Sequence, residues 1–282
     1  STHLRRTTPS SAMADASGLF SVRGHVILVT GASSGLGEHF ARLFSRAGAT
    51  VVVAARREAV LRSLVAELEA AGGRASAVAM DVMDRASVRD AVAEVLKTHG
   101  RIDTLINNAG ILVDGKSAQS HSEEDFGSVI GTNLTGAWRC AVEVATQWML
   151  KNGGNVVNVG SVLAVRQVRG SIAYLAAKAG VHQMTKALAL EWAGKGIRVN
   201  TLAPGYVLTE LIAKIFLKDP AGSQEANNFN EVGTQFVKGI PMRSFVELGD
   251  LDGPMMMLCS SASRKMTGTE VVVDGGHIVS SM

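Results

Sequence analysis

A regular alternation between short β-branched runs and longer helical stretches constrains this 282-residue chain more than any other feature. The stretches between the runs carry apolar residues at helical spacing, as Leu61, Leu64 and Leu68 do. This alternation predicts an α/β fold in which helices cover both faces of a parallel sheet. Because crossovers are right-handed, we expect a single doubly wound Rossmann-type domain with seven strands. The predicted strands are His25–Thr30, Thr50–Ala55, Ala75–Met80, Thr104–Ile106, Asn155–Val159, Ile197–Leu202 and Glu270–Val273.

Several residues mark the ends of the predicted helices. Asp84 and Ser122 stand where a helix should begin, and Asp125 follows Ser122 by three residues. Gly48, Gly72 and Gly100 fall just beyond helix ends, where a left-handed residue is favoured. These signals divide the apolar stretches into helices of ordinary length.

Two segments depart from the regular pattern. Residues 1–22 are rich in Ser, Thr and Ala, and we interpret them as a disordered tail or a remnant of expression engineering. The end of a mitochondrial leader is the alternative. Residues 23–282 contain no linker or repeat, which predicts one domain. Within it, residues 208–239 are polar and irregular, so we expect a helical flap over a site, with a surface loop as the alternative.

Composition argues against several classes of partner. The net charge is +3 and no long Lys/Arg block occurs, so we expect no nucleic-acid binding. The apolar runs fall far short of the roughly 18 residues that span a membrane. The seven histidines lack the spacing of metal ligands, and we predict no metal site.

The two cysteines, Cys140 and Cys259, lie far apart in apolar helical stretches. Neither has a CxxC partner, so we interpret both as structural thiols in a reducing compartment. We therefore expect a cytoplasmic protein, or a protein of the mitochondrial matrix if the first residues are the end of a leader.

A glycine-rich turn follows the first predicted strand, in the sequence Thr30-Gly31-Ala32-Ser33-Ser34-Gly35-Leu36-Gly37. Gly31 allows a sharp turn, Gly35 allows backbone to approach a pyrophosphate, and Gly37 allows the helix to pack close to the sheet. The helix N-terminus presents free N–H groups to a phosphate. The predicted phosphate-binding residues are Gly31, Ser33, Ser34, Gly35, Leu36 and Gly37.

The end of the second strand bears on the choice of nicotinamide cofactor. NAD-binding folds usually place a carboxylate there to bind the ribose 2′-hydroxyl. This chain has Arg56 and Arg57 instead, and guanidinium groups bind a 2′-phosphate bidentately. We therefore predict a preference for NADP(H), with NAD(H) possible. The alternative is that both arginines only begin a solvated helix.

Tyr174 and Lys178 lie four residues apart, thirteen residues after Ser161. On a helix this spacing places both side chains on one face. A tyrosine needs a nearby positive charge to act as an acid or base near pH 7, because its free pKa is about 10. The pair alone also fits an exposed helical surface, so its meaning depends on the other motifs.

Taken together, the motifs of residues 23–282 resemble the short-chain dehydrogenase/reductase family. The resemblance extends to members that act as 3-oxoacyl-carrier-protein reductases and gluconate 5-dehydrogenases. It is carried, in order along the chain, by Thr30–Gly37, Asp81-Val82, Asn107-Asn108-Ala109-Gly110, Asn133, Ser161, Tyr174 with Lys178, Pro204-Gly205 with Thr209, and Asp274-Gly275-Gly276.

This resemblance implies a role for each matching residue. The implied catalytic residues are Asn133, Ser161, Tyr174 and Lys178. The implied cofactor contacts are Asp81 and Val82 beside the adenine, Asn108, Ala109 and Gly110 beside the fourth strand, and Pro204, Gly205, Val207 and Thr209 near the nicotinamide, together with Tyr174 and Lys178. In the implied chemistry Ser161 polarises a carbonyl oxygen, Tyr174 moves the proton, and Lys178 lowers the tyrosine pKa.

The implied function is an NADP(H)-dependent oxidoreductase that interconverts a small-molecule ketone and a secondary alcohol. An NAD-dependent alcohol or polyol dehydrogenase and a non-catalytic dinucleotide sensor are the alternatives. Val162-Leu163-Ala164-Val165 suggests an apolar pocket, whereas Arg166 and Arg169 would meet an acidic substrate or lie in a solvated loop. Tyr206 shapes the pocket or packs in an interface.

The resemblance also implies a homo-oligomer, a tetramer or a dimer. In the family, the helices that carry the residues matching Asn133 and Tyr174 usually pair with those of another subunit. Trp138 and Trp148 lie in the first of these predicted helices, where they serve as interface anchors or as ordinary core residues.

Overall fold

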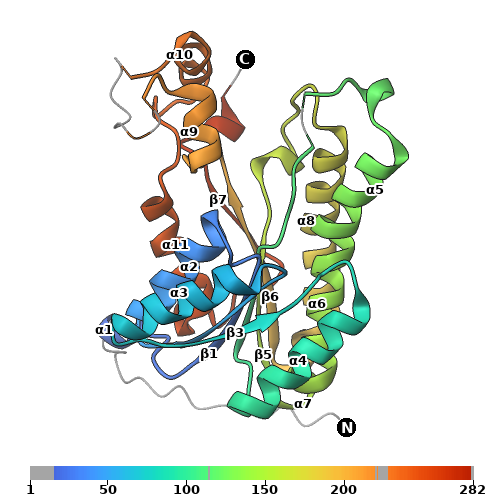
Figure 1. Ribbon diagram of the computed structural model, residues 1–282, viewed down its shortest axis with the longest axis vertical. Coiled ribbons are helices and arrows are strands. Elements are labelled where there is room, and N and C mark those ends of the chain that lie inside the picture. The colour runs from blue at the N-terminus through green and yellow to red at the C-terminus, as the bar shows by residue number, and fades with distance from the viewer. Residues whose placement is uncertain (1–15, 114, 220, 222–227, 281–282) are drawn as a thin grey trace, which may run out of the picture.

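Seven parallel strands form one continuous sheet at the centre of the molecule (Figure 1), in the order β3-β2-β1-β4-β5-β6-β7. The computed structural model describes residues 16–113, 115–219, 221 and 228–280. The strand order reverses between β1 and β4, which is the doubly wound arrangement expected from the sequence. The predicted fold class is therefore confirmed.

The strands lie within two residues of their predicted bounds. They are β1 (Val26–Thr30), β2 (Thr50–Ala55), β3 (Arg74–Ala79), β4 (Thr104–Asn107), β5 (Gly154–Val159), β6 (Ile197–Pro204) and β7 (Glu270–Val273). The largest difference is in β6, where Ala203 and Pro204 continue the ladder beside Val272 and Val273.

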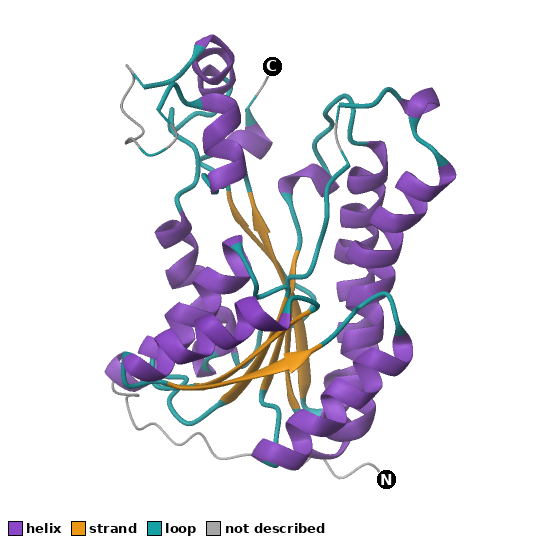
Figure 2. Ribbon diagram, viewed as in Figure 1, coloured by secondary structure: helices purple, strands orange, loops and turns teal. Residues whose placement is uncertain are grey.

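Helices cover both faces of the sheet (Figure 2). One face packs against α2 (Gly35–Arg46), α3 (Glu58–Ala70) and α11 (Asp252–Cys259) in a core that includes Phe40 and Phe44. The other face packs against α4 (Arg85–His99), α6 (Ala137–Val144) and α8 (Ile172–Trp192). Strands buried on both faces explain the continuous apolar runs of the sequence.

One long helical run bears two wide turns of the π type. It begins at α5 (Glu123–Ile130), passes through η2 (Gly131–Gly136) into α6, and continues through η3 (Ala145–Met149) to α7 (Leu150–Asn152). Ser122 and Asp125 form the predicted capping box at its start, and Asp84 caps α4. Asn133 lies in η2, and such bulges often mark functional sites.

Two short helices stand beyond one end of the sheet (Figure 1), where the sequence predicts a flap. They are α9 (Glu210–Phe216) and α10 (Glu231–Lys238). Phe216, Phe236 and Phe245 pack together between them with ring centroids 5.0–5.8 Å apart. The flap region therefore has a small apolar core of its own, which the polar and irregular sequence of residues 208–239 did not indicate. Residues 220 and 222–227 of the predicted flap lie outside the described residues.

The residues just before Arg23 contact the rest of the domain. Residues 16–19 form α1 (Ala16–Leu19), Leu19 accepts a hydrogen bond from Ser261 Oγ, and Val22 is fully buried. Residues 1–15 of the predicted tail lie outside the described residues.

The remaining short helical turns lie between the longer elements. They are η1 (Ala118–Ser120), η4 (Val162–Ala164), η5 (Ala193–Lys195), η6 (Leu248–Leu251), η7 (Ser261–Ser263) and η8 (His277–Val279).

Within the described ranges, no helix has both the length and the apolar character needed to span a bilayer. The same residues contain no group of three or more His, Cys, Asp or Glu side chains placed to hold a metal ion. Cys140 and Cys259 are buried free thiols, and burial raises both of their pKa values.

Candidate active site

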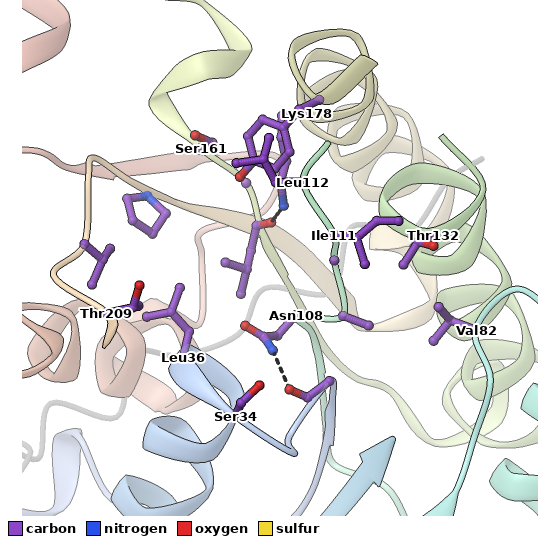
Figure 3. Close-up of a pocket in the computed structure, with 18 of the residues that line it drawn as sticks. Ser34, Leu36, Val82, Asn108, Ile111, Leu112, Thr132, Ser161, Lys178 and Thr209 are labelled. Carbon is purple, nitrogen blue, oxygen red and sulfur yellow. Dashed lines mark hydrogen bonds between the residues drawn. The ribbon is translucent and has the colours of Figure 1, made fainter. Parts of the chain in front are cut away.

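A cavity of about 580 Å³ opens at the carboxyl ends of the strands (Figure 3). Three predicted site residues, Gly35, Gly37 and Asn133, do not line it. The predicted site residues that line it are Gly31, Ser33, Ser34, Leu36, Arg56, Arg57, Asp81, Val82, Asn108, Ala109, Gly110, Ser161, Tyr174, Lys178, Pro204, Gly205, Val207 and Thr209. The cavity therefore gathers motifs from most of the chain.

The glycine-rich turn is held from behind by the end of β4. Gly31 has a φ of +66°, and any side chain there would come within 2.7 Å of Ala109 Cα. The Asn108 amide donates to the carbonyls of Thr30 and Gly31 at 3.0 and 3.3 Å. A Cβ on Gly37 would clash with the Gly31 carbonyl, so the helix lies as close to the turn as the sequence suggested. Asn108 thus fixes the turn that a phosphate would contact.

Arg57 lies over the same turn. Its Nη2 donates to Ser33 Oγ at 2.8 Å, and to Ser33 O and Ser34 Oγ at 3.3 Å each. Arg56 precedes it at the end of β2 and also lines the cavity. Guanidinium and hydroxyl donors therefore stand together at this end, where they can bind an anionic group.

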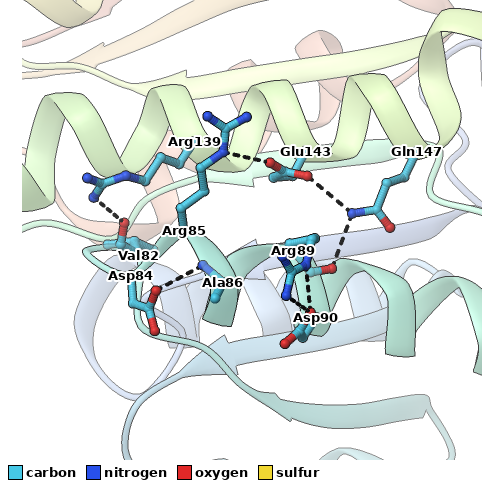
Figure 4. Close-up of polar contacts among 9 residues, drawn as sticks. All are labelled: Val82, Asp84, Arg85, Ala86, Arg89, Asp90, Arg139, Glu143 and Gln147. Atoms are coloured by element: carbon cyan, nitrogen blue, oxygen red, sulfur yellow. Dashed lines mark hydrogen bonds and ion pairs between the residues drawn. The ribbon is translucent and has the colours of Figure 1, made fainter.

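Asp81 and Val82 form the wall beside the glycine-rich end, and Met83 follows them in the same segment. The Asp81 carboxylate accepts from Met83 N at 2.9 Å. From α6, Arg139 Nη1 donates to Val82 O at 3.2 Å (Figure 4), and it also donates to Met83 O at 2.6 Å. Gly136 permits this approach, because a Cβ there would lie 2.8 Å from Val82 Cγ2. Arg139, which the motifs did not indicate, thus anchors this wall to α6.

Polar contacts also join α6, and the η3 turn that follows it, to α4 (Figure 4). Glu143 on α6 accepts from Arg85 Nε at 3.1 Å, and Gln147 donates to Arg89 O at 3.1 Å. The Arg85 guanidinium also lies 5.7 Å from the Trp138 ring centroid. These contacts fix α4 against α6 and so support the wall that Arg139 holds.

Ser161 and Tyr174 meet at the other end of the cavity. Ser161 follows β5, and its Oγ accepts from Leu163 N at 3.1 Å. Burial raises the pKa of the Tyr174 phenol, and a hydrogen bond with Ser161 only partly offsets this. The sequence led us to expect that Lys178 lowers the pKa of Tyr174, but in the protein without bound cofactor the pKa of Tyr174 is raised.

Lys178 projects from α8 one turn beyond Tyr174, as the spacing predicted. Its Nζ lies 5.5 Å from the Tyr174 ring centroid and donates to Val159 O at 2.7 Å. The side chain is 6% exposed, and burial lowers its pKa to about 8. The ammonium is therefore held against the phenol in a poorly solvated site.

Asn133 reaches the cavity wall indirectly. Its Oδ1 accepts from Ile111 N at 2.8 Å and its Nδ2 donates to Ile111 O at 2.9 Å. Ile111 itself lines the cavity. The amide thus uses both of its ends to fix the backbone that continues from Asn108-Ala109-Gly110.

The wall around Ser161 and Tyr174 is mostly apolar. The sequence suggested Val162 and Leu163 as part of an apolar pocket and Tyr206 as a residue that shapes it. All three line the cavity, whereas Ala164 and Val165 do not. Sequence motifs missed Ile111 and Leu112, which follow the Asn108-Ala109-Gly110 motif, and Ile212, which lies in the predicted flap. Thr132 was also missed, and it lines the cavity near Val82 (Figure 3).

Two arginines that had suggested an acidic substrate do not line the cavity. Arg166 Nη1 donates to His277 O at 2.6 Å and to Ser280 O at 3.4 Å, so this guanidinium binds the backbone of the C-terminal segment. Arg169 is exposed to solvent. Tyr206 lines the cavity and packs on Phe236 with centroids 4.4 Å apart, which supports the pocket role expected for it.

Comparison with known proteins agrees with this geometry. Residues 25–220 match the family model described as short chain dehydrogenase. The chain is 34% identical to the 3-oxoacyl-(acyl-carrier-protein) reductase FabG of Thermotoga maritima, over 92% of this chain and 99% of that protein. It is 33% identical to 2,5-dichloro-2,5-cyclohexadiene-1,4-diol dehydrogenase LinX of Sphingobium indicum, over 91% and 97% of the two chains.

A solved structure extends the comparison to the fold. The gluconate 5-dehydrogenase of Burkholderia cenocepacia, in complex with NADP and tartrate, superposes with a TM-score of 0.86 and 29% identity. The match covers 95% of this chain and all of that one. The likeness therefore spans both ends of the cavity.

Proposed function

The chain belongs to the short-chain dehydrogenase family of NAD(P)-dependent oxidoreductases, and from that premise we propose that it interconverts a neutral, largely apolar ketone and its secondary alcohol with NADP(H). One observation carries the proposal. Ser161, Tyr174 and Lys178 converge at one end of a cavity whose other end carries Arg56 and Arg57.

The residues of the cavity fit an extended dinucleotide. The Gly31 turn leaves no room for a side chain, and Arg57 with Ser33 supplies donors for a phosphate. Asp81 and Val82 would border the adenine, and Val207 and Thr209 the nicotinamide. When bound, the reduced cofactor supplies the hydride, and the protein supplies positioning and electrostatics.

Three side chains would serve the substrate oxygen. Ser161 would donate a hydrogen bond to the carbonyl, and Tyr174 would deliver the proton. Lys178 would hold positive charge beside the phenol. Since burial raises the tyrosine pKa, the reduction direction starts from a protonated phenol that is ready to donate. In the oxidation direction the phenolate would depend on this ammonium and on the positive charge of the oxidised cofactor.

The preference for NADP(H) follows from charge at the end of β2. Ala55 is followed by two arginines, and the cavity residues of this strand include no carboxylate. The Arg57 guanidinium already lies 2.8 Å from Ser33 Oγ, so little side-chain ordering is needed for it to meet a 2′-phosphate. The solved relative named for its NADP complex supports the same preference.

A neutral substrate follows from the lining of the opposite end. Among the described residues there, Ile111, Leu112, Leu163, Tyr206 and Ile212 are apolar or aromatic, and none is charged apart from Lys178. Lys178 donates to a backbone carbonyl and faces the phenol. A carboxylate on the substrate would therefore be desolvated without a dedicated cation, which is costly.

The proposal also includes a homo-oligomer in the cytoplasm. The helices that bear Asn133 and Tyr174 leave Phe126, Trp138, Ile172 and Leu190 between 39% and 84% exposed. A second copy would cover such residues. Trp148, in contrast, packs against the core. Sedimentation at micromolar concentration should give a dimer or tetramer, and a monomer would contradict this part.

Absorbance of the reduced nicotinamide provides the test. Purified protein is supplied with NADPH or NADH and with pairs of substrates, each a keto ester and its free keto acid. We expect turnover of esters, with kcat/KM at least about tenfold higher with NADPH than with NADH. Better turnover with NADH would favour the NAD-dependent alternative. Cofactor binding without turnover on any carbonyl or alcohol would favour the sensor.

A further inference from the structure

His182 extends the catalytic row of α8 by one more turn. Tyr174, Lys178 and His182 are spaced four residues apart, so they share one side of the helix. The His182 side chain is buried, with 5% of the residue exposed, and it does not line the cavity. Nothing in the chemistry assigned to the cavity uses this imidazole. Its position behind Ser161 calls for a separate explanation.

One ring nitrogen faces the end of β5. Ser161 N lies 3.4 Å from His182 Nε2 and donates to it. The ring fills the space beside Gly160, where any Cβ would clash with Nε2. One turn earlier, Lys178 Nζ donates to Val159 O at 2.7 Å. The helix therefore holds the strand end on both sides of Gly160, and the second contact belongs to the backbone of Ser161.

The other ring nitrogen faces an acidic residue on the outermost strand. His182 Nδ1 lies 3.1 Å from Glu270 Oε2, and the second oxygen of Glu270 lies 2.8 Å from Lys186 Nζ. Burial raises the pKa of Glu270, but the hydrogen bond from Lys186 and the interactions with the neighbouring His182 and Lys186 bring it below its usual value. A charged carboxylate therefore faces Nδ1 at neutral pH.

These contacts select one form of the ring. Nε2 can accept from Ser161 N only when it carries no hydrogen, so the neutral ring must bear its hydrogen on Nδ1. That hydrogen lies on the side of the ring that faces Glu270, whose Oε2 is 3.1 Å from Nδ1 in a close contact that is not aligned as a hydrogen bond. Burial keeps the pKa of His182 below its usual value, and Lys178 and Lys186 act in the same direction, whereas Glu270 opposes them.

We propose that His182, oriented by Glu270, is a positioning residue that fixes the backbone of Ser161 and thereby aims its hydroxyl at the substrate oxygen. The inference rests on the proposed function, because it assigns Ser161 to that oxygen. Ser161 Oγ is already tied to Leu163 N and to Tyr174. A shift of the Ser161 backbone therefore moves the hydroxyl relative to the phenol.

The arrangement has a consequence at low pH. Protonation would place an N–H on Nε2 against the N–H of Ser161, and it would add positive charge near Lys178 and Lys186. Glu270, the one carboxylate that contacts the ring in the described part of the chain, attracts the proton but lies on the far side. Activity should therefore fall as pH drops through the pKa of His182, which lies below the usual histidine value.

Two substitutions at one position provide the kinetic test. His182→Leu removes the acceptor, whereas His182→Gln can return an oxygen near the position of Nε2. We expect kcat to fall about 10- to 100-fold in His182→Leu, to recover largely in His182→Gln, and the KM for NADPH to change little in either. The acid limb of kcat should be absent from His182→Gln. An unchanged kcat in His182→Leu would overturn the proposal.

A matched control separates positioning from general stability. His99 is a half-buried histidine on α4 whose Nε2 contacts Ser76 Oγ at 2.8 Å, outside the cavity. His99→Leu should lower thermal stability without lowering kcat. If His182→Leu does not fold, Glu270→Gln replaces it, since that side chain is 24% exposed on β7. Because the Glu270 charge raises the pKa of His182, its loss should move the fall of kcat at acidic pH to lower pH values. An unchanged pH profile of kcat would overturn the proposal.

A readout independent of turnover keeps the two proposals distinguishable. Nitrogen-15 NMR of histidine-labelled protein, assigned with His182→Gln, should show His182 with its hydrogen on Nδ1 at neutral pH. A ring with its hydrogen on Nε2 would refute the positioning role, whatever the enzyme turns over. Failure of the wild-type protein to turn over any carbonyl would instead refute the proposed function.

Discussion

The two ends of the cavity are built in different ways. At the glycine-rich end, segments that follow β1, β2 and β4 are joined by hydrogen bonds, with Asn108 on the Gly31 carbonyl and Arg57 on Ser33. At the Tyr174 end, apolar residues from loops and from α9 form the wall, with Leu163 and Ile212 among them. The first end is polar and held by the sheet, and the second is apolar and assembled from distant segments.

This difference separates what a shared cofactor requires from what one substrate requires. A dinucleotide presents the same phosphates in every relative, so strand ends and a helix N-terminus suffice to bind it. A substrate is recognised by shape and by the few polar groups near it. We therefore expect substitutions at the two ends to separate cleanly, with cofactor KM affected at one and substrate kcat/KM at the other.

Lys178 lies where the two ends meet, and its removal should have the largest effect. Lys178→Met should lower kcat by about 10²- to 10⁴-fold, because the charge beside the phenol is lost. The same change should raise the free energy of unfolding by about 1–3 kcal/mol at pH 7, since a buried ammonium is costly. Steady-state kinetics and urea unfolding measure the two effects. Lys195→Met, at an exposed site, should change neither.

The pH dependence of this stability has a definite sign. The folded pKa of Lys178 is about 8, below its usual value of 10.5. The unfolded chain therefore binds more protons between these two values, and Lys178 should make the wild type more stable as pH rises through this window. Urea unfolding at several pH values should show the advantage of Lys178→Met shrinking over the same range. A constant advantage would contradict the burial cost.

The next largest effect is expected at the glycine-rich end. Removing both guanidinium groups in Arg56→Ala/Arg57→Ala should weaken NADPH binding about 10- to 100-fold, because charge-assisted hydrogen bonds are lost. NADH binding should change little. Arg62→Ala is the control, since Arg62 lies on α3 in an exposed ion pair with Glu58. Fluorescence titration with each cofactor measures the effect, and equal losses for both would refute the 2′-phosphate assignment.

A smaller effect is expected from the apolar wall. Leu163→Ala should lower kcat/KM for a bulky neutral ketone by about tenfold through lost apolar contact, with no change in the KM for NADPH. Val165→Ala serves as its control, because Val165 lies on the same loop, is 53% exposed and does not line the cavity. Loss of NADPH binding in Leu163→Ala would mean that the two ends are not independent.

The smallest effect is expected at Arg139. Arg139→Gln removes one of the anchors of the Asp81–Met83 wall, so the KM for NADPH should rise about two- to tenfold at unchanged kcat. Steady-state kinetics at saturating ketone measures it. A fall in kcat with constant KM would indicate instead that Arg139 acts on the catalytic end through α6.

The same contrast explains what could be predicted from sequence. The fold, the glycine-rich turn and the pairing of Tyr174 with Lys178 were readable because strand alternation, glycine spacing and an i, i+4 spacing are local patterns. Leu163 and Tyr206 were suggested by their places beside Ser161 and Gly205, but Ile111, Leu112 and Ile212 follow no local rule, because they come together only when loops and α9 fold over the strand ends. His182 was hidden for a related reason, since its partners Ser161 and Glu270 lie 21 and 88 residues away.

Electrostatics was the least predictable property. The spacing of Tyr174 and Lys178 indicated a phenol made acidic by its neighbour, but burial of the ring acts in the opposite direction. Arg166 was a candidate for substrate binding until its contacts with His277 and Ser280 were known. A charged residue that lies near a site residue in the sequence does not reveal its role until its burial and its hydrogen-bond partners are known.

Single-turnover kinetics of the Tyr174→Phe variant tests the central claim most directly. NADPH is first bound to the wild type and to the variant, with equal affinity confirmed by titration, and a neutral ketone is then added in a stopped-flow absorbance experiment. The variant should consume bound NADPH about 10²- to 10⁴-fold more slowly, because the proton donor is absent. Equal rates in the two proteins would show that Tyr174 does not deliver the proton and would contradict the account.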